Sequence, residues 1–163
     1  MENEPRAMLT PAILLVEDRA DDILLVQKAF QKAGVSNPIS VVRDGEEALG
    51  YLLGLGKFAD RTTFPFPTLL LLDLKMPKMD GFELLKSIRS LPLFKSLRVI
   101  VLTSSEDIFD VNRAYELGAS SFLIKPLEFE NFTALARTLA KFWFEQNRST
   151  VPTAELAEKD FAS

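Results

Sequence analysis

The sequence predicts a doubly wound α/β protein, in which helices cover both faces of a five-stranded parallel sheet. Short apolar runs alternate with longer segments whose apolar residues recur every three or four positions, the pattern of strands followed by helices. Two of the runs, Ala12–Val16 and Leu69–Leu72, are apolar throughout, which is typical of strands buried on both faces. The chain has 163 residues, of which 47% are hydrophobic, enough for one domain with a full core.

Five short apolar runs are the expected strands. In chain order they are Ala12–Val16, Ile39–Val42, Leu69–Leu72, Arg98–Leu102 and Ser121–Ile124. Each run is too short for a helix, and each is followed by a polar residue. Because crossovers between parallel strands are right-handed, few topologies can connect them.

Five helices are expected from apolar residues at helical spacing. They cover about residues 21–33, 45–53, 82–89, 106–117 and 128–146. Gly34 and Gly118 stop the first and the fourth of them. The last helix has the broadest apolar stripe, made of Phe129, Phe132, Leu135, Ala136, Leu139, Phe142 and Trp143. Residues 54–67 are expected to form a surface loop, longer than most connections between a helix and a strand.

The composition excludes several kinds of chemistry. The chain has no cysteine and no histidine, which excludes disulfides, thiol catalysis, Ser-His-Asp hydrolysis and metal sites built from Cys or His. The formal net charge is -4 and no basic run is present, so the sequence gives no indication of a nucleic-acid-binding surface. No apolar segment approaches ~20 residues, and the amino terminus lacks the apolar core of a signal peptide. We therefore expect a cytoplasmic protein that does not cross a membrane.

Four of the strands are followed by residues that can carry chemistry. The first strand is followed by Glu17 and Asp18, the third by Asp73, the fourth by Thr103 and the fifth by Lys125. Parallel strands share one carboxyl edge, where open α/β sheets bind ligands, so these side chains should meet there. Neighbouring carboxylates repel one another unless a hard cation joins them, and oxygen ligands suit Mg²⁺. A lysine and a hydroxyl beside them suit a phosphoryl group, so the pattern indicates phosphoryl transfer to Asp73.

Five short motifs resemble those of the receiver domains of two-component response regulators. They are Leu15-Val16-Glu17-Asp18, Leu71-Leu72-Asp73-Leu74, Met76-Pro77-Lys78-Met79-Asp80-Gly81, Val101-Leu102-Thr103-Ser104 and Lys125-Pro126. The resemblance implies a flavodoxin-like receiver fold with strand order 2-1-3-4-5. It also implies a division of the chain into an amino-terminal extension (1–11), a receiver domain (12–147) and a carboxyl-terminal tail (148–163).

The resemblance further implies roles for the residues near the phosphoryl group. Asp73 would be the phosphoacceptor, Thr103 would bond a phosphoryl oxygen, and Lys125 would pair with the group. Phe122 would occupy the aromatic switch position of the family. A cis peptide bond between Lys125 and Pro126, also expected, would turn the lysine head towards the acceptor.

A metal site and a phosphodonor are implied in the same way. Asp18, Asp73 and the backbone carbonyl of Lys75 would bind Mg²⁺, and Glu17 would act through water. Because the chain has no histidine of its own, a separate sensor histidine kinase would supply the phosphoryl group. The protein would be a phosphoacceptor that loses the group slowly, rather than an enzyme.

Three residues depart from the commoner pattern of the family. Arg19 stands where many relatives carry Asn or Asp, and Lys75 where Asn is frequent, beside the path of attacking water. Phe122 lacks the hydroxyl of the commoner Tyr. These departures bear on the lifetime of the phosphate and on the form of the switch. The long loop before the third strand and Trp143-Phe144 resemble single-domain regulators encoded beside bacterial phytochromes, which indicates a phytochrome as the kinase.

Two other functions fit the sequence less well than phosphorylation-controlled signalling. An aspartyl-phosphate phosphatase normally needs a second Asp two positions after the nucleophile, where this chain has Lys75. A receiver that binds partners without being phosphorylated is disfavoured by the intact acidic site. The other acidic residues, Asp21, Asp22, Asp44 and Asp80, are read as helix-start or turn residues.

The output of the domain is expected to be a changed surface that another protein, or a second copy, reads. The expected place is the face formed by the fourth helix, the fifth strand and the last helix. Phe144 falls outside the buried stripe if the last helix runs regularly, leaving an apolar group for a partner. We therefore expect a homodimer through this face.

Overall fold

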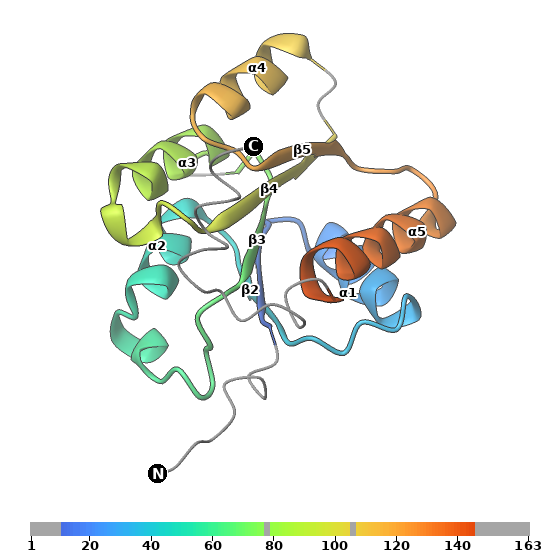
Figure 1. Cartoon of the computed structure of the whole chain (residues 1–163), viewed down its shortest axis with the longest axis horizontal. Helices are drawn as coiled ribbons and strands as arrows, with labels where there is room; N and C mark the ends of the chain where they lie inside the picture. Colours follow the sequence, from blue (N-terminus) through green and yellow to red (C-terminus); the bar gives the residue numbers. More distant parts are fainter. Residues whose placement is uncertain (1–10, 77–78, 105–106, 146–163) are drawn as a thin grey trace.

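The computed structural model describes residues 11–76, 79–104 and 107–145 (Figure 1). Its strands form one parallel sheet in the order β2-β1-β3-β4-β5. They are β1 (Ile13–Val16), β2 (Ile39–Val42), β3 (Leu69–Leu72), β4 (Arg98–Thr103) and β5 (Ser121–Ile124). The predicted fold class and strand order are confirmed, and each strand lies within one residue of its predicted limits.

Helices cover both faces of this sheet. They are α1 (Ala20–Lys32), α2 (Gly45–Leu53), α3 (Gly81–Ser90), α4 (Ile108–Glu116) and α5 (Phe129–Leu139). Figure 1 shows α1 and α5 together on one side of the sheet, and α2 and α3 on the other side, with α4 beyond α3. In the part of the chain that the structure describes, no helix has the length and hydropathy needed to cross a bilayer.

The central strands are apolar throughout because their side chains alternate between two cores. In β1, Leu14 and Val16 belong to the core shared with α2 and α3, whereas Ile13 and Leu15 belong to the core shared with α1 and α5. The leucines of β3 divide in the same way, and all of them are buried. Burying one such side chain stabilises the fold by about 1.5–3 kcal/mol, so neither face of these strands tolerates a polar residue.

The last helix differs from the prediction. α5 ends at Leu139, and the chain continues as a π-helix, η4 (Ala140–Glu145), instead of a regular helix to residue 146. A π turn holds more residues than an α turn, so apolar residues spaced three or four positions apart no longer all face the core. Phe142, predicted in the buried stripe, is accordingly 56% exposed. The side chains of Trp143 and Phe144, and residues 146–163, lie outside the described residues.

The long loop before β3 closes over an aromatic cluster. It contains the 3-10 helix η2 (Gly56–Ala59), and the rings of Tyr51, Phe58 and Phe64 lie 5.0–6.0 Å apart between centroids. Arg61 donates hydrogen bonds to the backbone oxygens of Tyr51 and Leu52 at 2.8 and 2.9 Å. These oxygens belong to the last turn of α2, where carbonyls lack helical partners, so Arg61 ties the loop to the helix end.

Candidate functional site

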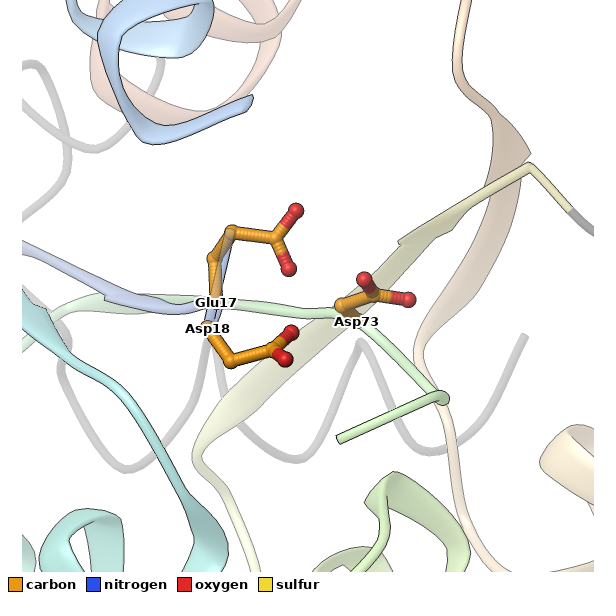
Figure 2. Close-up of side chains that lie close together, drawn as sticks. All are labelled: Glu17, Asp18 and Asp73. Atoms are coloured by element: carbon orange, nitrogen blue, oxygen red, sulfur yellow. The ribbon is translucent and has the colours of Figure 1, made fainter. Parts of the chain in front are cut away.

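Three carboxylates meet at the carboxyl edge of the sheet. Glu17 and Asp18 directly follow β1, and Asp73 directly follows β3, the strand beside it. Figure 2 shows the three side chains gathered around one space, and one oxygen of each lies within 4.8 Å of the others. The cluster forms because Val16 and Leu72 are paired in register, so the residues after them leave the sheet side by side.

The buried oxygens of this cluster suit a cation. Glu17 and Asp73 are almost completely buried. Among the described residues, the buried atoms Glu17 Oε2 and Asp18 Oδ1 have no hydrogen-bond partner. A buried acceptor without a partner costs about 1–3 kcal/mol, and a hard cation with oxygen ligands removes that cost and the repulsion between the carboxylates. The three residues therefore form an acidic site that can hold a divalent cation.

Lys125 lies at the cluster, and its ammonium group contacts three carboxylates. Its Nζ donates hydrogen bonds to Glu17 Oε1 at 2.7 Å and to Asp22 Oδ2 and Asp73 Oδ2 at 3.3 Å. Burial alone would lower the pKa of Lys125, but the three carboxylates outweigh burial and raise that pKa. The lysine therefore remains charged at neutral pH beside Asp73.

Glu17 holds its proton more strongly than an ordinary carboxyl group. Its pKa is raised from 4.5 to about 8, first because burial disfavours the charged form and then because of its hydrogen bond with Asp73. The charge of Lys125 acts in the opposite direction without outweighing them. At neutral pH the cation-free site therefore keeps a proton that a cation would have to displace.

Thr103 and Lys75 lie on two segments next to Asp73: Thr103 ends β4, the strand beside β3, and Lys75 follows Asp73 by two residues. Thr103 ends β4 and is fully buried, and its backbone oxygen accepts a hydrogen bond from the backbone N–H of Lys125 at 2.8 Å. This bond keeps the start of the β5–α5 turn beside β4. Lys75 is exposed, and its backbone N–H donates to Asp73 Oδ1 at 3.2 Å. The hydrogen bonds from Lys75 and Lys125 reach different oxygens of Asp73, so they fix the orientation of its carboxylate.

Phe122 lies one strand farther from the cluster. It is half-buried and packs against the small core formed by Leu74, Phe82, Val101 and Ala114. Its backbone N–H donates to the hydroxyl of Tyr115 on α4 at 3.1 Å. This hydrogen bond joins β5 to α4 at the predicted switch position. The sequence alone indicated no role for Tyr115.

After Asp73 the chain turns into α3, and the start of α3 at Gly81 lies close to the backbone of Asp73 and Leu74. Asp80 caps α3, and its side chain accepts a hydrogen bond from the backbone N–H of Glu83 at 2.9 Å. A Cβ atom at Gly81 would lie 2.6 Å from the backbone oxygen of Asp73 and from the Cα of Leu74. Only glycine fits there, so Gly81 allows α3 to pack directly against the segment that carries the carboxylate.

One prediction about this site is wrong. The Lys125–Pro126 bond is not cis, and no cis peptide bond occurs among the described residues. Lys125 still reaches Asp73 and Glu17. Its four-carbon stem is long and flexible enough to place the ammonium group from a trans bond.

Sequence reasoning missed Asp22, which it treated as a helix-start acid. Asp22 lies in the first turn of α1, yet its Oδ2 accepts a hydrogen bond from Lys125. Burial opposes its charge, but a hydrogen bond with Glu17 and the charges of Lys125 and Arg19 outweigh burial and lower the pKa of Asp22. The available signal was its spacing: Asp22 is one helical turn after Asp18, in a helix that starts at the edge of the site.

Comparisons with known proteins agree with this geometry. The family model for the response regulator receiver domain matches residues 13–137. Probable methanogenesis regulatory protein FilR2 of Methanothrix harundinacea is 39% identical over 140 residues, which cover 86% of this chain and 88% of that protein. Response regulator Rcp1 of Synechocystis sp. is 35% identical over 142 residues, covering 87% of this chain and 93% of Rcp1.

Solved structures of such regulators are similar as well. The Mn²⁺-bound form of response regulator Rcp1 matches with a TM-score of 0.74 and 34% identity, covering 88% of this chain and 99% of that one. The phosphorylated cyanobacterial phytochrome response regulator RcpA matches with a TM-score of 0.77 and 34% identity, over the same shares of the two chains, 88% and 99%. The protein described here therefore belongs to the response regulator receiver domain family.

Proposed function

We propose that Asp73 accepts a phosphoryl group from a sensor histidine kinase in a reaction that depends on Mg²⁺. A receiver domain is the phosphoacceptor of two-component signalling and not an enzyme that turns over a substrate. An oxygen of Asp73 would form a bond to phosphorus while the bond between phosphorus and the imidazole nitrogen of the kinase breaks, and the electron pair returns to that nitrogen. We assign this activity to residues 12–147, between the extension (1–11) and the tail (148–163).

The position of one ammonium group carries this proposal. Lys125 Nζ lies 3.3 Å from Asp73 Oδ2 and 2.7 Å from Glu17 Oε1, at a cluster of three carboxylates. An isolated structural ion pair does not need three carboxylates around one space. A nucleophile that receives a phosphoryl group needs a cation and a lysine close to the oxygens of that group.

The neighbouring residues take the roles that the family pattern implies. Asp18, Asp73 and the backbone carbonyl of Lys75 would hold Mg²⁺, with Glu17 acting through water. When bound, the cation would neutralise charge on the phosphoryl oxygens. Thr103 would donate a hydrogen bond to one of those oxygens. That bond would draw Thr103 inwards and open space into which Phe122 turns.

Phosphotransfer from purified kinases tests the proposal. We expect label to pass from a phosphorylated histidine kinase to this chain in Mg²⁺ and to stay on the kinase in excess EDTA. Because RcpA is a phytochrome response regulator, we propose a bacterial phytochrome as the kinase, and expect faster transfer from one than from an unrelated sensor kinase. Equal rates of phosphotransfer from the two kinases would contradict the proposal that the kinase is a phytochrome. Failure of every kinase, and of acetyl phosphate, in Mg²⁺ would overturn the proposed function.

We also propose that the signal is read at the α4–β5 surface, formed by Ile108, Phe109, Tyr115, Ile124 and Leu127. These apolar side chains are all exposed, on two elements that pack against each other and on the turn that follows. Exposed apolar groups concentrated on neighbouring elements mark an interaction site. A second copy is the proposed partner, because one apolar surface can pair with itself about a two-fold axis.

Sedimentation of two matched variants tests this dimer. Phe109→Glu places a charge on the α4–β5 surface, whereas Leu93→Glu places the same charge on an equally exposed site at the opposite end of β4, since Phe109 is 77% and Leu93 75% exposed. With a phosphoryl analogue, wild type and Leu93→Glu should dimerise and Phe109→Glu should weaken the dimer at least tenfold. A wild type that remains monomeric with and without the analogue would show that the reader is another protein.

A further inference from the structure

Asp22 is the carboxylate at the site to which neither the family pattern nor the cation cluster gives a role. The cation cluster consists of Glu17, Asp18 and Asp73, and Asp22 is not among its members. Asp22 lies on α1, yet its Oδ2 is 3.3 Å from Lys125 Nζ, the same distance as Asp73 Oδ2. We propose that Asp22 is a positioning residue, which holds the ammonium group of Lys125 where it meets the phosphoryl group. This inference rests on the proposed phosphorylation of Asp73.

The geometry of the ammonium group explains why a third carboxylate is needed. Lys125 has three N–H donors and three carboxylate acceptors, one each from Glu17, Asp22 and Asp73. Glu17 and Asp73 also belong to the cation cluster, so a bound cation competes for their charge. Asp22 is outside that cluster and stays available to the lysine. Because a lysine stem is flexible, one partner that does not change during the reaction restricts where the ammonium group can move.

Asp22 also contacts a second cation, Arg19. Arg19 Nε lies 3.7 Å from Asp22 Oδ2, and Arg19 Nη2 lies 3.6 Å from Asp21 Oδ2. The Asp22 side chain is 26% exposed, whereas that of Asp21 is 77% exposed. Asp22 Oδ2 therefore contacts two cations, Lys125 and Arg19, and the helix backbone sets its position. Asp21, on the same turn and with the same charge, shows no contact with Lys125 and provides a matched control.

The test measures phosphorylation by acetyl phosphate at saturating Mg²⁺ in four proteins: wild type, Asp22→Ala, Asp22→Asn and Asp21→Ala. Losing one hydrogen bond to a charged group should slow Asp22→Ala by about fivefold to tenfold. Asp22→Asn retains an oxygen that accepts from Lys125 and should keep at least about half of the rate. Asp21→Ala should match wild type. Thermal unfolding should show that all four proteins are folded, and Mn²⁺ binding followed by electron paramagnetic resonance should change less than about threefold.

Each outcome decides between positioning and its alternatives. A wild-type rate for Asp22→Ala overturns the inference. An Asp22→Asn rate as low as that of Asp22→Ala also overturns it, because charge and not the accepted hydrogen bond would then matter. Loss of Mn²⁺ binding in Asp22→Ala would make Asp22 part of the cation site instead. Asp73→Asn in the same assay separates the two proposals: if it is labelled normally, the proposed function fails, whatever Asp22 does.

Discussion

Asp73→Asn is expected to take up no phosphoryl group from acetyl phosphate in Mg²⁺, whereas the mass of the wild type should rise by one phosphoryl group. The asparagine amide has the shape of the carboxylate but cannot form an acyl phosphate. Mass spectrometry of the intact chain measures the result directly. The expected loss is complete, because none of the other carboxylates of the site accepts hydrogen bonds from both Lys75 and Lys125.

The fold should survive this substitution. An asparagine at position 73 has one acceptor oxygen, so it keeps only one of the hydrogen bonds from Lys75 and Lys125, which reach different oxygens of Asp73. It also removes one charge from a buried group of carboxylates, which favours the fold. We therefore expect the cation-free variant to unfold at or above the wild-type temperature. Asp80→Asn is a suitable control, because Asp80 caps α3 and is not a member of the acidic cluster. Labelling of Asp73→Asn at the wild-type level would place the acceptor elsewhere.

Divalent cation binding is expected to strengthen as the pH rises, until about pH 8. The pKa of Glu17 is raised to about 8 in the cation-free protein, so below that pH the site keeps a proton. A cation favours the ionised form and must displace that proton, which costs up to about tenfold in affinity for each pH unit below the pKa. Above that pH no proton competes and the affinity should level off. Titration with Mn²⁺ at several pH values measures this dependence.

Two variants separate the parts of this prediction. Glu17→Gln carries no titratable proton, so its Mn²⁺ affinity should be nearly flat between about pH 6 and pH 8. Asp18→Ala removes a carboxylate whose buried Oδ1 has no hydrogen-bond partner among the described residues, so binding should weaken about 100-fold and phosphorylation should be lost while the fold remains. The assignment of Asp18 is wrong if that variant still takes up phosphate at the normal rate in Mg²⁺.

The cation-free protein should show the reverse trend in stability. Glu17 has a pKa of 4.5 before burial and about 8 in the folded state, so between these values the folded state binds more protons than the unfolded one. Stability from this group is therefore present below about pH 4.5 and is lost as the pH rises through about 8. The same carboxyl group thus favours the folded, cation-free protein at low pH and cation binding at high pH.

The sequence alone determined the fold and most of the site. Leu69–Leu72 could only be a strand covered on both faces, because four consecutive leucines leave no face for water. Residues that follow parallel strands must emerge at one edge, so Asp18, Asp73 and Lys125 could be placed together without coordinates. Both inferences depend on the two-residue repeat of strands and on strand direction, which are local properties of the chain.

Only the tertiary structure decided which other residues join the site and how its charges behave. Asp22 has the sequence features of any acid in a first helical turn, and its contact with Lys125 depends on how α1 is placed over the sheet. The pKa of Glu17 depends on burial by elements distant in sequence. The change to a π-helix at Ala140 likewise could not be predicted from the spacing of the apolar residues. The contact of Asp22 and the pKa of Glu17 depend on segments far apart in the chain, so residue spacing could indicate that Asp22 lies near the site but not that it contacts Lys125.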